Sequence, residues 1–358
     1  MRIIHCADIH LDSKMEANLS KEKARERNNE ILITFRNMVE YANLNQIDAI
    51  IIAGDLFDTK NVSALTKNML RDIIVSNNNI EFLYLKGNHD KASFFDDCEY
   101  LPDNLKMFNE EWTYYNYGDV CIGGILLNNN DRMIYNELTL NENMFNIVVM
   151  HGQTLKYIND DITDTINIPE LKNKNIDYLA LGHIHSYIEE RLDDRGIYCY
   201  SGCLEGRGFD ECGPKGFVVL DIDNHKLNTT FVKFSKRDLS IIEADITNCT
   251  TTMEAEGAIE RAIENISKDD LVKIYLTGEV SIDAEIDTDF LNDRFGNIFY
   301  YAKIYNKSTL AINYKDYMND ISLKGEFIRM VLNSELSKDE KDQIILHGLK
   351  ALTGEELV

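Results

Sequence analysis

The chain has 358 residues, 44% of them hydrophobic, and a formal net charge of −24 at neutral pH. This length allows two or three domains, and no run of about eighteen apolar residues is present to cross a membrane. Acidic side chains outnumber basic ones in residues 1–235 and again in residues 236–358. This balance counts against a nucleic-acid partner held by overall charge, although metals or local patches can still hold one.

The N-terminus and the cysteines indicate a cytoplasmic protein. Charged and polar side chains interrupt the first residues, so we expect no secretory signal, and seven scattered cysteines are typical of reduced thiols. Cys199, Cys203 and Cys212 lie close together, which leaves a thiolate metal site open. Their spacing lacks a CxxC pair and a fourth ligand is not obvious, so free thiols are the favoured interpretation.

Short apolar runs bounded by polar turns predict strands that are buried on both faces. The runs cover residues 2–7, 47–54, 80–87, 120–127, 146–152, 176–183, 197–202 and 216–223. Helical spacing between the early runs predicts helices over residues 21–41 and along Leu65, Met69 and Ile73. Strands that alternate with helices indicate an α/β layered core. Strand patterns follow one another without helices after residue 176, which predicts a second sheet built of hairpins.

The pattern changes near residue 236. Strand patterns and one helix, marked by Ile259, Ile263 and Ile266, predict a small α+β domain over residues 236–312. Two helical patterns follow over residues 313–358, and a capping box is expected to start the second of them. The first is lined by Leu323, Phe327 and Val331, the second by Ile345, Leu349 and Leu352, and the capping box runs from Ser337 to Glu340. The apolar faces of these two helices either pack on their own protein or form a groove for a partner.

Five of the predicted strands end in side chains that bind metals. These are Asp8 and His10, Asp55 and Asp58, Asn88 to Asp90, His151, and His183 and His185. Because ligands gather at the carboxyl ends of strands in α/β sheets, we expect these side chains to converge. Carboxylate, imidazole and amide oxygen together suit manganese, iron or zinc better than calcium. A pair of such ions about 4 Å apart can hold a phosphate and generate hydroxide.

The turn around His89 gives this site a candidate acid. Asn88 is expected to bind metal, while His89 points to the other side of the turn and protonates the departing oxygen of a phosphodiester. Asp90 either orients His89 by a hydrogen bond or caps the turn. A glycine precedes Asp55, Asn88 and His183, where it lets the backbone turn sharply and approach a ligand.

Together these five blocks, in this order over residues 1–235, resemble the calcineurin-like metallophosphoesterase superfamily. The spans RIIHCADIHLD, AGDLFD, LKGNHD and ALGHIH resemble its SbcD-type DNA exonuclease subunits, bacterial relatives of the double-strand-break-repair nuclease. The resemblance implies an α/β fold: a two-sheet sandwich flanked by helices as the nuclease core (residues 1–235). A small α+β capping domain (residues 236–312) and a C-terminal helical pair that docks on an ATPase (residues 313–358) follow.

The same resemblance implies a role for each site residue. Asp8, His10 and His185 would bind one divalent ion; Asn88, His151 and His183 would bind the other, and Asp55 would bridge them. His89 would be the catalytic histidine, and Asp58 would act near the metals. Manganese is the expected ion, with iron, zinc or magnesium as alternatives. Arg207 and Lys215, in the loop after the last block, are candidate phosphate contacts. Ser201-Gly202-Cys203 stands there without the proline that family members often carry.

The implied activity is that of a two-metal DNA nuclease in repair and recombination. Such enzymes degrade double strands from 3′ to 5′ and nick single strands or hairpins. The expected partners are DNA, an SMC-like coiled-coil ATPase of the SbcC type and a second copy of the chain. The alternative is a phosphatase or cyclic-nucleotide phosphodiesterase on the same core, which the negative charge favours. The segment beyond the core favours the nuclease, because a small-molecule esterase does not need it.

Overall fold

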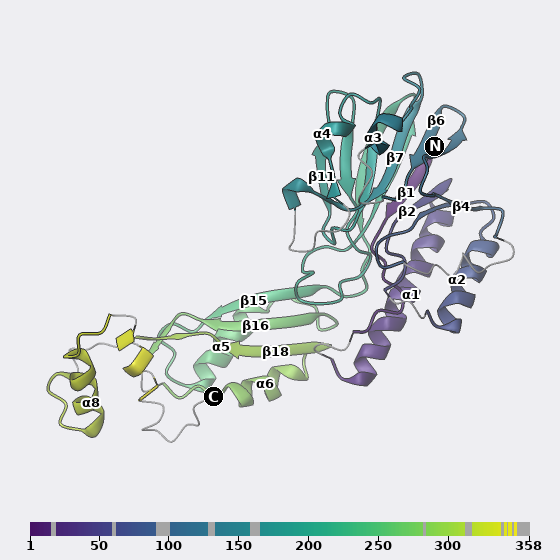
Figure 1. Cartoon of the computed structure of the whole chain (residues 1–358). Coiled ribbons are helices and arrows are strands. Elements are labelled where there is room, and N and C mark those ends of the chain that lie inside the picture. Colours follow the sequence, from purple (N-terminus) through teal and green to yellow (C-terminus); the bar gives the residue numbers. More distant parts are fainter. Residues whose placement is uncertain are drawn as a thin grey trace. The chain divides into compact units, whose positions relative to one another are not determined.

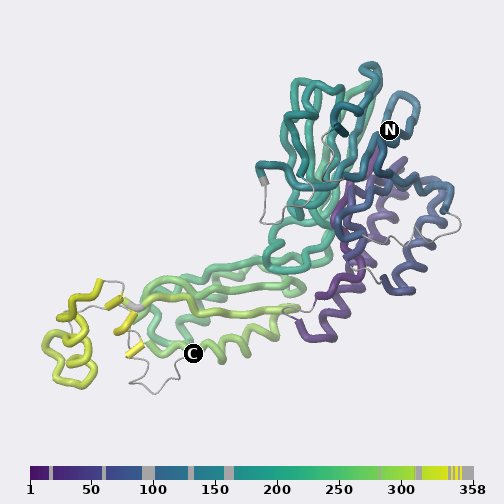
Figure 2. Tube along the Cα trace, viewed as in Figure 1, coloured from purple at the N-terminus to yellow at the C-terminus, as the bar shows by residue number. Residues whose placement is uncertain are grey.

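The computed structural model describes residues 1–15, 19–58, 62–90, 101–127, 133–157, 165–281, 284–311, 317–337, 340–341, 343–345 and 347–348. Two compact units, Met1–Leu239 and Ser240–Val358, make up the chain (Figures 1 and 2). No helix among these residues is long and apolar enough to cross a membrane. The division into three domains with separate roles stays a prediction.

A six-stranded sheet carries the N-terminal strand of the first unit. Its order is β14 (Lys226–Lys233), β13 (Gly216–Asp223), β1 (Arg2–Cys6), β2 (Ala49–Ala53), β3 (Glu81–Leu85) and β4 (Leu105–Met107). Strands β1 to β4 are parallel, and β13 runs antiparallel to β1 and β14. Helices α1 (Lys21–Leu44) and α2 (Ala64–Ser76) pack on one face, where Phe35 and Leu70 join the same apolar cluster as Ile50 and Phe82.

The second six-stranded sheet is mostly parallel. Its order is β11 (Ile188–Arg191), β12 (Ile197–Tyr200), β10 (Tyr178–Gly182), β7 (Phe145–His151), β6 (Val120–Gly124) and β5 (Thr113–Tyr117). Only the edge strands β5 and β11 pair in antiparallel fashion. The prediction that this sheet is built of hairpins is therefore wrong, because the hairpin of β13 and β14 joins the first sheet.

The two sheets pack face to face in the first unit. Side chains of alternate residues, such as Ile51 and Leu83 from one sheet and Ile147 and Tyr178 from the other, form a shared buried core. The outer face of the second sheet is covered by the short helices α3 (Ile134–Glu137) and α4 (Ile168–Leu171). Short strands β8 (Gln153–Thr154) and β9 (Thr165–Ile166) pair beside it. The predicted two-sheet sandwich flanked by helices is confirmed.

The second unit is built on the sheet of β15 (Leu239–Asp245), β16 (Leu271–Thr277) and β18 (Tyr301–Asn306). Helices α5 (Thr252–Ala262) and α6 (Thr288–Gly296) cover one of its faces. A capping box of Thr251 and Glu254 starts α5, because each residue satisfies a backbone N–H of the other. Strands β17 (Glu279–Ser281) and β19 (Thr309–Ala311) pair nearby.

Helix α8 (Leu323–Leu332) follows, with a small apolar cluster of its own. Ile328 and Val331 pack with Ile345, so part of the predicted second stripe contacts the first. The backbone N–H of Ser337 donates to Glu340 Oε2 at 2.9 Å, and that of Glu340 donates to Ser337 Oγ at 3.4 Å, as the capping box predicts. Leu349 and Leu352 of that stripe lie outside the described residues.

Candidate metal centre

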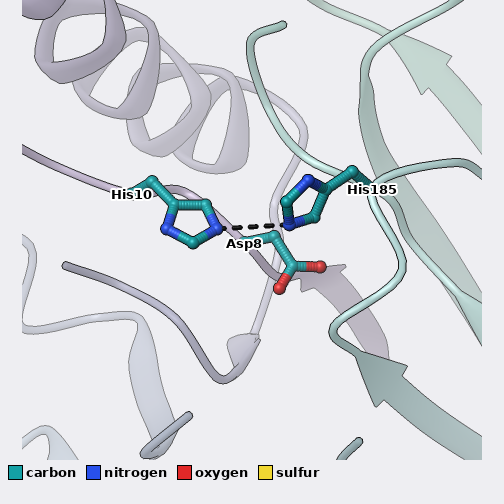
Figure 3. Close-up of side chains that lie close together, drawn as sticks. All are labelled: Asp8, His10 and His185. Carbon is teal, nitrogen blue, oxygen red and sulfur yellow. Dashed lines mark hydrogen bonds between the residues drawn. The ribbon is translucent and has the colours of Figure 1, made fainter. Parts of the chain in front are cut away.

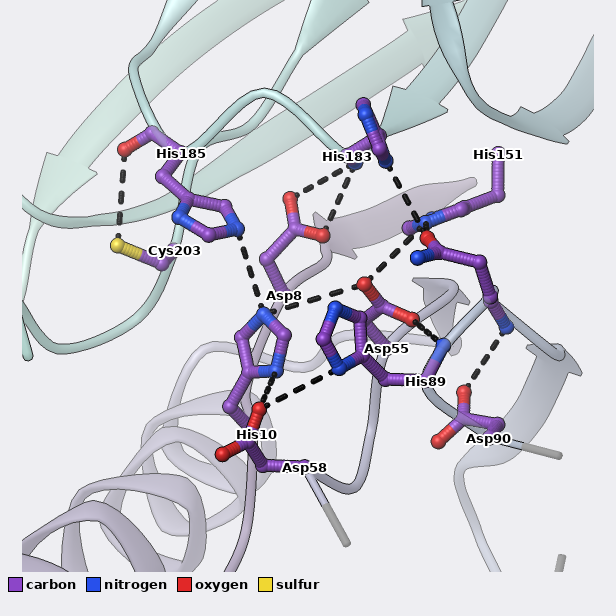
Figure 4. Close-up of polar contacts among 12 residues, drawn as sticks. Asp8, His10, Asp55, Asp58, His89, Asp90, His151, His183, His185 and Cys203 are labelled. Carbon is purple, nitrogen blue, oxygen red and sulfur yellow. Dashed lines mark hydrogen bonds and ion pairs between the residues drawn. The ribbon is translucent and has the colours of Figure 1, made fainter. Parts of the chain in front are cut away.

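Side chains from both sheets meet where five strands end (Figure 4). Strands β1, β2 and β3 of the first sheet lead into Asp8, Asp55 and Asn88. Strand β7 of the second sheet ends at His151, and β10 leads into His183. The site therefore lies at the carboxyl ends of parallel strands, where α/β proteins bind ligands.

Glycines let these chains approach one another. A Cβ atom on Gly54 would lie 2.0 Å from His151 Nδ1, one on Gly87 would lie 2.1 Å from Asp55 Oδ1, and one on Gly182 would lie 2.0 Å from the carbonyl oxygen of Ala53. No side chain fits at such distances, and Gly54 also has a φ of 93°. The predicted role of the three glycines in close backbone approach is therefore confirmed.

The backbone at the site is strained. Asp8, His10 and Asp55 each have a φ of 50°, and His183 has a φ of 99°. This left-handed region costs a residue with a Cβ atom about 1–2 kcal/mol. Backbone hydrogen bonds between neighbouring strand ends hold this conformation. The N–H of Asp8 donates to the carbonyl oxygen of Gly54 at 3.1 Å, and the N–H of His10 donates to the carbonyl oxygen of Asp55 at 3.0 Å. Such strain typically persists at functional sites.

The first group of candidate ligands is Asp8, His10 and His185 (Figure 3). One ligand atom from each lies within 4.8 Å of the others, and His10 Nε2 is 3.3 Å from His185 Nε2. Two imidazole nitrogens and a carboxylate that face one point suit a divalent ion of the manganese, iron or zinc type.

The second group is Asp55, His151 and His183, whose ligand atoms also lie within 4.8 Å of one another. Asn88 joins it, because its Oδ1 lies 3.1 Å from His151 Nε2 and 3.3 Å from His183 Nδ1. The structure thus brings together every residue that the sequence predicts as a ligand, in the two predicted sets.

Asp55 lies between the two groups. Its Oδ2 is 3.3 Å from His151 Nε2 and 3.9 Å from His10 Nε2. Burial alone would raise the pKa of Asp55, but the two histidines hold it well below its usual range. Burial likewise opposes charge on His151, yet Asp55 raises the pKa of His151 to about 10. A carboxylate with one oxygen near both groups is suited to bridge two cations.

The far nitrogens of the first group face carboxylates. His10 Nδ1 lies 3.1 Å from Asp58 Oδ1, and His185 Nδ1 lies 2.7 Å from Glu211 Oε1. Burial disfavours charge on His185, but the hydrogen bond to Glu211 raises its pKa. Carboxylates in this position fix the ring orientation of metal-binding histidines and raise their basicity.

Arg207 joins these two carboxylates. Its guanidinium donates to Asp58 Oδ1 at 3.1 Å and to Glu211 Oε1 at 2.9 Å. Sequence reasoning missed Glu211, because an acidic residue in a loop carries no signal until the fold places it behind a histidine. Arg207 was expected to contact phosphate, and that role stays a prediction.

His151 in the second group has a different partner. Its Nδ1 lies 2.9 Å from the carbonyl oxygen of Ala53. A neutral backbone group therefore orients this ring and leaves Nε2 facing Asp55 and Asn88.

His89 lies at the edge of the site with its side chain 46% exposed. Its backbone N–H donates to Asp55 Oδ1 at 2.9 Å, and its Nδ1 lies 3.5 Å from Asp58 Oδ1. Asp90 caps the turn, because its carboxylate accepts hydrogen bonds from the backbone of Leu56, Phe57 and Gly87. Of the two roles considered for Asp90, the structure supports the cap.

The position of Lys215 does not suit the phosphate contact expected from the sequence. Its side chain is buried, and Nζ donates to the carbonyl oxygen of His185 at 2.6 Å. We therefore propose that Lys215 positions His185, in place of the phosphate contact expected from its loop.

The three neighbouring cysteines do not form a cluster that could hold a metal among the described residues. Cys199 and Cys203 are buried free thiols, and Cys212 Sγ lies 3.2 Å from the carbonyl oxygen of Phe209. Burial raises the pKa of Cys199 to about 12, which keeps this thiol protonated and a poor ligand.

Residues 1–187 match the calcineurin-like phosphoesterase family. The chain belongs to this family. It is 25% identical to the SbcD component of the nuclease SbcCD of Staphylococcus saprophyticus, with 100% of this chain and 94% of that protein covered. It is 21% identical to the DNA double-strand break repair protein Mre11 of Sulfolobus acidocaldarius, over 80% of this chain and 77% of that protein.

A third relative belongs to the metallophosphoesterases by its name. The uncharacterized metallophosphoesterase YhaO of Bacillus subtilis is 26% identical over 68% of this chain and 64% of that protein. Family membership makes this phosphoesterase a hydrolase with side chains that can bind divalent metals.

Proposed function

We propose that this phosphoesterase is a two-metal DNA nuclease that works with an SMC-like ATPase in DNA repair. Its activities are double-strand exonuclease action from 3′ to 5′ and endonuclease action on single strands or hairpins. The proposal includes manganese as the ion, a homodimer and a cytoplasmic location. Two groups of candidate ligands with Asp55 near both support it, together with full-length similarity to a protein named as part of a nuclease.

The chemistry of the donor set fits two divalent ions. Asp8, His10 and His185 would hold one, Asn88, His151 and His183 the other, and Asp55 both. When bound, such a pair supplies a clamp for the phosphate and a water molecule of lowered pKa as nucleophile.

The protein's own side chains orient the ligands and move a proton. Asp58 and Glu211 hold the rings of His10 and His185, and Arg207 balances the charge of these two carboxylates. His89, close to Asp58 yet exposed, donates a proton to the oxygen that leaves phosphorus. Asp58 thus acts both near His10 and near the catalytic histidine.

The C-terminal segment is proposed as the docking site for the ATPase. Leu323 and Met330 are exposed on one face of α8, seven residues apart, and apolar groups gathered on one exposed face are typical of an interaction surface. Ile321 is 99% exposed, Leu323 68% and Met330 67%. Replacing Leu323 and Met330 by Lys should abolish binding to a coiled-coil ATPase partner while metal binding is retained.

End-labelled duplex DNA tests the activity. The purified chain should shorten the DNA from its 3′ ends when manganese is present, and chelator or His89→Ala should prevent this. Intact DNA together with rapid hydrolysis of p-nitrophenyl phosphate would contradict the nuclease assignment.

A small-molecule phosphatase or cyclic-nucleotide phosphodiesterase is the second candidate. One observation favours it: the net charge of −24 repels a long polyanion. The same metal centre serves both reactions, since one fold hosts many substrates. The paired assay on DNA and p-nitrophenyl phosphate distinguishes them.

A further inference from the structure

Four charged side chains are buried together in the first unit, apart from the two groups of ligands. Arg27 and Glu30 lie on α1, Glu205 lies in the loop between β12 and β13, and Arg237 lies in the segment between β14 and β15. Each has an exposed fraction of 7% or less. These four side chains are called the buried charge cluster.

Ion pairs balance the charges of the cluster. The guanidinium of Arg27 donates to Glu30 Oε2 at 2.5 Å and to Glu205 Oε2 at 3.1 Å. Arg237 donates to Glu30 Oε1 at 2.8 Å. Burial alone would raise the pKa of Glu30, but its basic neighbours, Arg237 first among them, lower it to about 2. Two positive and two negative side chains therefore face one another out of contact with water.

Stability alone does not account for this arrangement. Charged groups lose their hydration when they are buried, and apolar side chains of similar volume often stabilise a fold as well as a buried ion pair does. A buried charge does restrict its surroundings, because a shifted partner would leave it unpaired. The cluster is therefore better suited to hold neighbouring segments in one arrangement than to add stability.

Glu205 joins the three segments that meet at the cluster. Its Oε1 accepts hydrogen bonds from the hydroxyl of Thr34 on α1 at 2.7 Å and from the backbone N–H of Lys236 at 2.6 Å. Next to it, the carbonyl oxygen of Gly206 accepts a hydrogen bond from Arg27 Nη2 at 2.9 Å. Helix α1 and the segment after β14 thus hold the loop at these two residues.

The same loop carries the groups that support His185. The backbone N–H of Arg207 donates to Glu211 Oε2 at 2.8 Å, and Glu211 Oε1 lies 2.7 Å from His185 Nδ1. At the end of the loop, Lys215 donates to the carbonyl oxygen of His185, and its own carbonyl oxygen accepts the N–H of Phe234 at 2.8 Å. The segment after β14 therefore contacts the loop at two places, on either side of the groups that face His185.

We propose that the buried charge cluster positions this loop so that Glu211 faces His185. Glu205 is the central positioning residue, because it is part of the loop and accepts hydrogen bonds from both neighbouring segments. The proposal rests on the proposed function in taking His185 as a metal ligand. It adds a link between the first group of ligands and residues 234–239, which end at the start of β15.

This link should act in both directions, because a coupling free energy between two sites is reciprocal. Displacement of residues 234–239 should lower the affinity of the first group for an ion. Binding of the ion should in turn make this segment open less often. The second group should be independent of the cluster, since the carbonyl oxygen of Ala53 orients His151.

Manganese alone is the probe, added to the full chain by isothermal titration without DNA. Glu205→Gln removes one charge of the cluster and keeps the size of the side chain. It should weaken one manganese site about tenfold, the lower end of the effect of groups that orient a ligand, and leave the other unchanged. Because both residues act through His185, adding Glu211→Gln to Glu205→Gln should weaken that site by less than the product of the single effects.

Two further measurements keep the test independent of folding defects in Glu205→Gln. Thr34→Val removes one hydrogen bond to Glu205 without a change of charge, and it should weaken the same site by a smaller factor. Hydrogen exchange measured by mass spectrometry reports the opening of residues 234–239. Saturating manganese should slow their exchange in wild type and not in Glu205→Gln.

Asp177→Asn is the matched control. Asp177 pairs with Arg195 at 2.9 Å and its side chain is 13% exposed. It directly precedes β10, whose other end leads to His183. This variant loses a carboxylate from a partly buried ion pair, and both manganese affinities should remain. Unchanged manganese binding in Glu205→Gln and Thr34→Val, or equal weakening of both sites, would overturn the proposal.

The outcomes separate this proposal from the nuclease assignment. Manganese-dependent DNA cleavage by wild type, with unaltered manganese binding in Glu205→Gln and Thr34→Val, overturns the role of the cluster and leaves the nuclease standing. Selective weakening of one manganese site in these variants, without any DNA cleavage by wild type, supports the cluster and overturns the nuclease.

Discussion

The two groups of candidate ligands on either side of Asp55 are oriented by different partners. In the first, carboxylates hold the histidine rings: Asp58 faces His10 and Glu211 faces His185. In the second, the carbonyl oxygen of Ala53 holds His151. The first group therefore depends on charged side chains, which substitution can remove, whereas the second depends on backbone that only the fold can place.

This difference affects electrostatics as well. The carboxylates of the first group raise the basicity of its histidines and would strengthen their bonds to an ion. Arg207 sits between those carboxylates and offsets their charge. The second group has a neutral backbone partner, so its charge balance depends on Asp55. The two groups thus lie on either side of Asp55 and differ in what orients their histidine rings, although Asp8 of the first group also accepts the backbone N–H of His183 in the second.

Replacing Asp55 should have the largest effect, because it touches both groups. Asp55→Asn should lower manganese-dependent DNA cleavage about a thousandfold or more, since each ion supplies several kcal/mol of transition-state stabilisation. End-labelled DNA gives the rate. Asp72→Asn, an exposed carboxylate on α2, is the control and should behave as wild type. Loss of only one ion in Asp55→Asn would show that the two sites do not share it.

His89→Ala should have the second-largest effect on DNA cleavage, because it removes a proton donor and leaves both sets of ligands intact. We expect a loss of about 10²–10⁴-fold in DNA cleavage. Manganese stoichiometry should not change. Bis(p-nitrophenyl) phosphate should be hydrolysed with a smaller loss, because nitrophenolate leaves without a proton. An equal loss on both substrates would argue against His89 as the acid.

Glu211→Gln tests whether the two groups of ligands are supported by different partners. Removing the carboxylate behind His185 should weaken one manganese site about 10–100-fold and leave the other unchanged. Isothermal titration with manganese measures both sites in the protein itself. Glu190→Gln, a carboxylate paired with Lys156 outside the site, is the matched control. Equal weakening of both sites would mean that Glu211 supports the loop and not one ring.

The smallest predicted effect concerns His5, whose protonation should change the free energy of unfolding and not the catalytic rate. Its Nδ1 lies 2.9 Å from Tyr178 Oη, and burial lowers the pKa of His5 to about 3. The unfolded chain takes up this proton below about pH 6.5, whereas the folded chain does not. Stability should therefore fall by about 2 kcal/mol between pH 7 and about pH 5.

Urea unfolding in chelator at these two pH values checks this prediction. His5→Asn keeps a polar atom near Tyr178 and should lose this part of the pH dependence, with unchanged catalysis at pH 7. An unaltered pH dependence in the variant would mean that His5 is charged in the folded protein.

Much of the site could be predicted because its metal-binding side chains come directly after predicted strands. Asp8, His10 and Asn88 directly follow buried apolar runs, and such runs are recognised from composition alone. Glycines such as Gly54 and Gly182 marked the places where backbones approach. The structure then placed these residues in the predicted groups.

Other features depended on long-range contacts that a sequence does not show. Glu211 lies behind His185 only after the loop folds back, and Lys215 is buried with its Nζ donating to the carbonyl oxygen of His185. Strands after residue 176 gave no sign of which sheet they join, because periodicity reports burial and not pairing. The hairpin prediction failed for this reason.

Electron paramagnetic resonance of the manganese-loaded protein tests the central claim most directly. Two ions bridged by Asp55 should give two equivalents per chain and an exchange-coupled spectrum that appears with the second equivalent. Asp55→Asn should abolish the coupling. Two magnetically independent ions in the wild-type protein, or a single equivalent at saturation, would contradict a shared two-metal centre.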